Sequence, residues 1–110
     1  YIPNSGVIYT ADNTFEVKNV VYGKVTQIAN DEFFGKYVIV EHDNNLRTYY
    51  YGLTELEVEV GDLVTCGAVL GMSTNNIYND KYSLLFEVYH NNELINPNEV
   101  FGNDLSIYES

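Results

Sequence analysis

In this 110-residue chain, two histidines and one cysteine are the side chains best suited to bind a transition metal. A hydrolytic zinc site needs three nitrogen, oxygen or sulfur ligands and an open position for water. His42 lies at the end of an expected hairpin strand and His90 lies in an expected turn, where histidines are usually solvated or bonded locally. Cys66 is a lone thiol without a histidine beside it in sequence, and it has no partner for an internal disulfide. These residues do not predict a catalytic metal or thiol centre.

Other motifs of enzyme chemistry are missing from the sequence. It has no Gly-x-Gly-x-x-Gly or Walker loop for phosphates and no Gly-x-Ser-x-Gly elbow for a nucleophilic serine. Residues 58–71 resemble the hairpin of a biotinyl or lipoyl carrier, but no lysine lies there in a suitable turn. The carboxylates are scattered over turns and strand edges, as on a solvated face, and do not form a spaced calcium loop: Asp12, Asp31, Glu32, Glu41, Asp43, Glu55, Glu57, Glu59 and Asp62.

The composition is that of an acidic globular domain. There are 16 Asp and Glu residues against 5 Lys and Arg, which gives a net charge of −11. Such a surface repels nucleic-acid phosphates and anionic lipid headgroups and suits a basic protein partner better. Hydrophobic residues make up 45% and charged residues 19% of the chain, and tyrosine is common, with 11 residues. This argues for a folded core and against disorder.

The length predicts one domain, which we place at residues 1–110 with a core at about 4–101. No signal peptide or transmembrane run is present in these residues. The chain starts at Tyr1 and not at Met, so we expect it to be a fragment, and the lack of an anchor in these residues does not show that the full protein lacks one.

The strand expected at 81–89 organises the elements that must position any site. It alternates as a half-buried strand should. One face is predicted to lie in the core: Tyr82, Leu84, Phe86 and Val88. The other is predicted to face the functional surface: Ser83, Leu85, Glu87 and Tyr89.

The rest of the chain predicts an all-β domain, because short alternating runs are separated by turn signals and no long 3.6-residue apolar stripe occurs. Loops are expected at 30–36 and 72–80, and tight turns at 43–45 and 90–92. Further strands are expected before residue 10 and at 15–18, 20–29 with a bend at Gly23, 37–42, 46–53, 63–64, 69–70 and 94–95.

The order and spacing of these segments resemble those of the LytM-type, or lysostaphin-type, peptidase family M23. Residues 48–53, Thr-Tyr-Tyr-Tyr-Gly-Leu, resemble the family segment Thr-x-Tyr-x-His-Leu. Residues 83–88, Ser-Leu-Leu-Phe-Glu-Val, lie where the family has His-Leu-His-Phe-Glu-Val. Residues 15–25, 38–42, 58–71 and 96–97 match other family segments in order and spacing. The resemblance implies a twisted antiparallel, β-sandwich-like domain (a duplicated hybrid) with long loops and a groove across it.

The departures from the family bear on activity. In the family's His-x-Gly-x-Asp segment, Asn4 replaces the zinc-binding His and Ile8 replaces the zinc-binding Asp. Leu85 replaces the third zinc ligand, and Ser83 and Gly52 replace the two catalytic histidines. Since neither Ile8 nor Leu85 has a donor atom, the resemblance implies a pseudo-peptidase with no zinc and no other cofactor. Ser83 also has no histidine near it in the family geometry, so we do not expect a serine nucleophile.

The degenerate site is expected to form a partly apolar groove made by Asn4, Ile8, Tyr50, Gly52, Ser83 and Leu85. By the period-2 rule Thr48, Tyr50 and Gly52 share one face of their strand. We consider Tyr50, Thr48 and Tyr89 as candidates for partner binding. Two outcomes stay open: an exposed contact surface, or a cleft that Ile8 and Leu85 seal by packing together.

Within the family, the chain is most similar to a sporulation group that has lost the metal site. Shared features are the segment 3–7, the loop 31–35 and the missing histidine at Gly52. The resemblance implies an extracytoplasmic interaction module at the forespore membrane. Its implied partner is an ectodomain like that of stage III sporulation protein AH, in a possible ring and with strand-edge pairing as a natural mode. The alternatives are a degenerate activator of a cell-wall amidase and a peptidoglycan-binding module.

Overall fold

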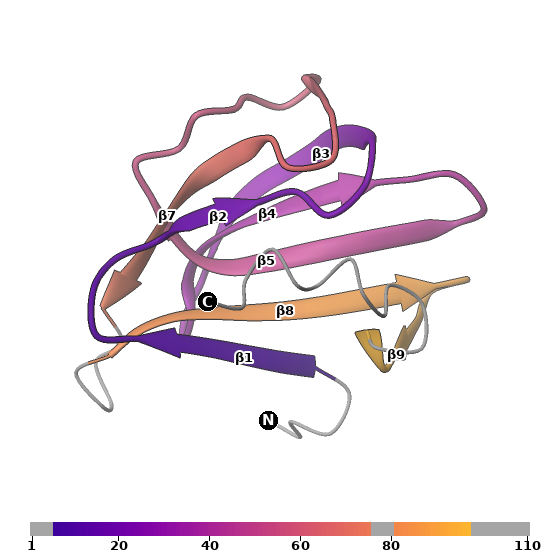
Figure 1. The fold of residues 1–110 in the computed structure, drawn as a ribbon. Coiled ribbons are helices and arrows are strands. Elements are labelled where there is room, and N and C mark those ends of the chain that lie inside the picture. Colours follow the sequence, from indigo (N-terminus) through magenta and orange to yellow (C-terminus); the bar gives the residue numbers. More distant parts are fainter. Residues whose placement is uncertain (1–5, 76–80, 98–110) are drawn as a thin grey trace.

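Strand β8 (Tyr82–His90) is the centre of the antiparallel sheet that residues 6–75 and 81–97 form in this computed structural model. It pairs with β1 (Gly6–Ala11), β5 (Leu46–Thr54), β7 (Val69–Asn75) and β9 (Glu93–Ile95). The sheet curls, and Figure 1 shows β2 and β7 in front of β3 and β4. The predicted all-β class is therefore confirmed.

The remaining strands complete the order β1-β8-β7-β5-β4-β3-β6, with β2 paired to β7. They are β2 (Glu16–Lys18), β3 (Gly23–Asp31), β4 (Gly35–Glu41) and β6 (Leu63–Val64). No helix in the part of the chain that the structure describes is both long and apolar enough to cross a lipid bilayer.

The two tight turns are confirmed, and asparagines form both. Asn44 and Asn45 join β4 to β5 with φ of 64° and 59°, and Asn91 and Asn92 join β8 to β9 with φ of 52° and 66°. Positive φ at both central residues matches the right-handed twist of a hairpin, and asparagine tolerates it better than most residues. The turns also contact each other, since Asn45 Nδ2 donates to Asn91 Oδ1 at 3.1 Å.

The predicted core face of β8 is confirmed for Leu84, Phe86 and Val88, which are all fully buried. The other face carries Ser83 and Leu85, which line the cavity described below, but Leu85 and Glu87 are each only 4% exposed, so this face is more buried than expected. β8 is an interior strand of the sheet, so side chains of the neighbouring strands lie beside both residues. Leu85 lies opposite Tyr51 of β5, and Glu87 lies opposite Tyr49.

Two expected loops are shorter than predicted. β3 continues to Asp31 and β4 begins at Gly35, so only residues 32–34 form the connection that was expected at 30–36. β7 extends through Asn75, where a loop was expected from Met72 onwards. Pairing with β5 and β8 keeps this polar stretch extended. The rest of that expected loop, 76–80, lies outside the described residues.

Candidate functional site

Residues of β1, β5, β7, β8 and the β3–β4 connection surround a cavity of about 250 Å³. Four of the six residues predicted for the degenerate groove line it together, namely Ile8, Gly52, Ser83 and Leu85. Of the other two, Asn4 lies outside the described residues, and Tyr50 is described below. The other lining residues are Asp31, Glu32, Phe33, Phe34, Gly35, Tyr51, Thr74 and Asn75.

Ile8 and Leu85 lie side by side in this cavity because they are direct cross-strand partners between β1 and β8. Leu85 is buried, whereas Ile8 is 48% exposed. An open volume remains between these side chains and the β3–β4 connection. Among the described residues, Ile8 and Leu85 thus leave a groove beside them and do not fill it.

Gly52 interrupts the alternation of β5 at the edge of the cavity. Tyr51 pairs with Tyr37 and Leu53 pairs with Lys36, so Gly52 is one extra residue in β5, with a φ of +95°. A Cβ atom at this position would lie 3.0 Å from the Ser83 carbonyl oxygen. A bulge of this kind reverses which residues face inward. Leu53, only 2% exposed, therefore returns to the core.

Thr48 and Tyr50 do not line the groove, contrary to the prediction. Both are fully buried in the core, on the opposite side of β5 from the cavity. The Tyr50 hydroxyl donates to Asn19 Oδ1 at 3.1 Å and accepts from the Val20 amide at 3.2 Å and from Thr48 Oγ1 at 3.1 Å. Burial raises the pKa of Tyr50 well above its usual range. Two polar side chains are thus held inside by mutual hydrogen bonds, which the strand pattern alone does not reveal.

His42 extends this buried polar network and does not reach the cavity. Its Nδ1 donates to the Tyr22 carbonyl at 2.9 Å, and its Nε2 lies 2.9 Å from Thr48 Oγ1. Gly23 leaves room for the imidazole, since a Cβ there would lie 2.6 Å from Nδ1. Burial lowers the pKa of His42, and the Tyr22 carbonyl and the carboxylates of Asp43 and Glu41 partly offset this.

Tyr89 belongs to a row of tyrosines on the cavity side of the sheet. Its ring centroid lies 4.7 Å from that of Tyr49, whose ring is 6.0 Å from Tyr51, which is 4.9 Å from Tyr37. The guanidinium of Arg47 lies 5.8 Å from the rings of both Tyr49 and Tyr89. Tyr89 therefore remains a candidate for partner binding on the surface beside the cavity, although it is not one of the lining residues. Burial, with the Glu87 carboxylate, raises the pKa of Tyr89 and of Tyr51.

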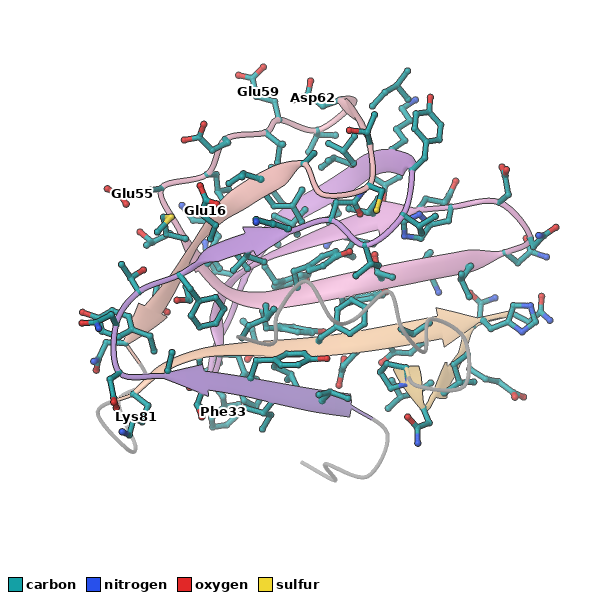
Figure 2. The ribbon with its side chains drawn as sticks, viewed as in Figure 1. Glu16, Phe33, Glu55, Glu59, Asp62 and Lys81 are labelled. Carbon is teal, nitrogen blue, oxygen red and sulfur yellow. The ribbon has the colours of Figure 1, made fainter. Side chains whose placement is uncertain are left out.

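Sequence reasoning missed the contribution of the β3–β4 connection. Phe33 is 64% exposed, and Figure 2 shows it at the end of the molecule away from Glu59 and Asp62. Asp31 Oδ2 accepts from the Phe33 and Phe34 amides, both at 2.8 Å, and so shapes the turn. Two adjacent phenylalanines in an expected loop were a usable signal, because exposed apolar residues often mark contact surfaces.

The donor set of this cavity does not fit a zinc ion. Ile8 and Leu85 present hydrocarbon where the resemblance places ligands, and the lining carboxylates are those of Asp31 and Glu32. No group of three His, Cys, Asp or Glu side chains within residues 6–75 and 81–97 is placed to hold a metal ion. The Ser83 hydroxyl oxygen is buried and has no hydrogen-bond partner among the described residues.

Comparison with known proteins agrees with this fold. Stage II sporulation protein Q of Bacillus subtilis (strain 168) is 34% identical over 85 residues, which are 76% of this chain and 30% of that protein. The chain thus spans less than a third of that relative. In the crystal structure of a SpoIIIAH and SpoIIQ complex, one chain matches with a TM-score of 0.79 and 30% identity, over 87% of this chain and 70% of that one.

The fold also matches that of the antimicrobial peptidase lysostaphin from Staphylococcus simulans. The TM-score is 0.80 over 97% of this chain and 46% of that one, at 21% identity, a similarity that concerns the fold alone. The predicted LytM-type fold is therefore confirmed. Since residues 3–97 also match the model of peptidase family M23, the chain belongs to that family.

Proposed function

We propose that this chain is a catalytically inactive M23 domain that serves as an extracytoplasmic protein–protein interaction module. The observation that carries the proposal is the pair Ile8 and Leu85, two hydrocarbon side chains facing each other where the family resemblance places zinc ligands. A hydrolytic zinc centre needs nitrogen, oxygen or sulfur ligands, and these two side chains provide none. What remains is an open cavity with exposed apolar side chains, which suits recognition better than hydrolysis.

The proposed partner is an ectodomain like that of SpoIIIAH. The similarity to stage II sporulation protein Q and to a chain of the SpoIIIAH and SpoIIQ complex supports this choice. The net charge of −11 favours a partner with a basic contact surface. In this proposal the domain lies between the forespore and mother-cell membranes, on a protein anchored in the forespore membrane. Several copies would form a ring with the partner.

The proposed unit is a single LytM-like domain over residues 1–110, with its core at about 4–101, inside a longer protein. One edge of its sheet is available for strand pairing, since within the described residues β1 pairs only with β8. Its six residues are long enough to template a partner strand, whereas β6 at the opposite end of the strand order has two.

The test is complex formation between the purified 110-residue chain and the SpoIIIAH-type ectodomain of the organism that encodes it. We expect co-elution in size-exclusion chromatography and a defined stoichiometry in sedimentation velocity. Peptidoglycan hydrolysis by the chain alone should equal that of a buffer control.

Two other outcomes would contradict the proposal. Stimulated hydrolysis on addition of a cell-wall amidase, without a SpoIIIAH complex, would make the chain an amidase activator. Retention on purified peptidoglycan without any protein partner would make it a wall-binding module. A salt titration adds a check, because a complex held partly by charge should weaken as ionic strength rises.

A further inference from the structure

We propose that the cavity beside Gly52 receives one basic side chain, a lysine or an arginine, presented by the protein partner. This rests on the proposed interaction function and names the chemistry that the partner must bring to this site. The volume supports a single side chain, because about 250 Å³ is below the range of ordinary small-molecule pockets.

The walls suit the methylene stem of such a side chain. Ile8 and Leu85 form an aliphatic wall on β1 and β8. Tyr51, the cross-strand neighbour of Leu85, continues this wall, and its ring forms a corner with that of Phe34, with centroids 5.9 Å apart and planes at 62°. Lysine and arginine bury an apolar stem while the charged head stays near water or a counter-charge. Aromatic rings additionally attract a cation through their faces.

The polar side chains described in the lining can accept hydrogen bonds from a cation, but none of them carries a positive charge that would neutralise an anion. Asp31 and Glu32 bring two carboxylates, and no Lys, Arg or His is among the lining residues. Glu32 is exposed beside Phe33, so its carboxylate can reach a charged head at the mouth. The hydroxyl oxygen of Ser83, another lining residue, is buried without a hydrogen-bond partner among the described residues.

Residue 52 lines the cavity with backbone alone. The resemblance places a histidine there, and in this chain Gly52 presents only backbone between the Ser83 and Phe34 carbonyls, 3.0 Å and 3.5 Å from an ideal Cβ position. The cation in this proposal is supplied by the partner's side chain and not by a bound metal ion.

The test is an NMR titration of the ¹⁵N-labelled 110-residue chain with capped pentapeptides of glycine that carry one central residue. The central residue is lysine, norleucine or glutamate. We expect millimolar binding of the lysine peptide, with shifts at residues 31–35, 51–52 and 83–85. Norleucine has the same stem without the charge and should bind about tenfold more weakly. Equal binding of the lysine and norleucine peptides, or shifts outside the cavity, would overturn the proposal.

A charge variant and its matched control locate the site. Glu32→Gln should weaken binding of the lysine peptide about threefold. Glu59→Gln removes the same charge at the other end of the molecule (Figure 2) and should leave binding unchanged. If both variants weaken binding equally, the peptide senses only the net charge and the cavity has no role. A Phe33→Ala variant, which carries no charge change, should also weaken binding at the cavity and nowhere else.

Failure of this inference can be told apart from failure of the proposed function. If the SpoIIIAH-type ectodomain binds wild type and Glu32→Gln equally and the lysine peptide does not bind, the interaction role stands and the cavity assignment falls. If the lysine peptide binds at the cavity and no ectodomain complex forms, the cavity assignment stands and its partner must be another protein.

Discussion

Ile8 of β1 and Leu85 of β8 are direct cross-strand partners, and both side chains line the same cavity. Side chains at such paired positions have Cβ atoms about 5 Å apart, close enough for two ligands to share one metal ion. In this chain both are hydrocarbon. The spacing would suit a ligand pair from two strands, but neither side chain has a donor atom.

Restoring donors at these two positions should restore metal affinity. We expect wild-type protein to hold only substoichiometric zinc after dialysis against micromolar zinc, and the double variant Ile8→Asp with Leu85→His to retain clearly more. Each single variant is the control, since one ligand alone does not chelate. Inductively coupled plasma mass spectrometry measures the metal, and circular dichroism checks the fold. Stoichiometric zinc in the wild type would contradict the pseudo-peptidase proposal.

A side chain at position 52 should destabilise the fold more than one at position 61. Gly52 and Gly61 have similar φ, +95° and +101°, but a Cβ at Gly52 would lie 3.0 Å from the Ser83 carbonyl, whereas nothing lies within 4 Å at Gly61. We expect Gly61→Ala to cost about 1 kcal/mol of unfolding free energy through backbone strain alone. Gly52→Ala should cost about 1–2 kcal/mol more. Urea unfolding measures both, and equal losses would contradict the crowding at Gly52.

Removing the hydroxyl of Tyr50 should destabilise the core. Tyr50→Phe leaves the buried groups of Asn19, Val20 and Thr48 without a shared partner. We expect a loss of about 1–3 kcal/mol in unfolding free energy. Tyr37→Phe is the matched control, since its hydroxyl accepts one exposed bond from Gln27 at 3.2 Å and should cost under about 0.5 kcal/mol. A Tyr50→Phe protein as stable as wild type would show that these contacts do not stabilise the fold.

Stability should decline in mild acid because of His42. Burial lowers the pKa of His42 below its usual 6.5, so the unfolded chain takes up a proton at a pH where the folded chain resists it. The free energy of unfolding therefore falls as the pH drops below about 6.5, by at most about 1.4 kcal/mol per pH unit from this group. Urea unfolding between pH 7.5 and pH 5 measures the slope.

The variant His42→Gln tests the origin of that slope. It should be less stable at neutral pH, because it disturbs the contacts with Tyr22 and Thr48. Between pH 6.5 and pH 5 its stability should vary less with pH than that of wild type. An unchanged slope would assign the pH dependence to other groups.

Local patterns in the sequence determined most of the strand framework. The alternation of Leu84, Phe86 and Val88 identified the buried face of β8, because side chains alternate along a strand whatever its partners are. The asparagine turns followed in the same way from backbone preferences of single residues. That Ile8 and Leu85 carry no donor atom also needed no structure, since it depends on side-chain chemistry alone.

Only the tertiary structure decided which of these residues share the site. The bulge at Gly52 depends on how β5 pairs with β4, and it separates Thr48 and Tyr50 from the groove. The burial of Glu87 depends on rows of side chains from strands distant in sequence. The β3–β4 connection reaches the cavity because the curled sheet brings it there. Register and sheet curvature arise from nonlocal pairing, and a local pattern of apolar and polar residues does not encode them.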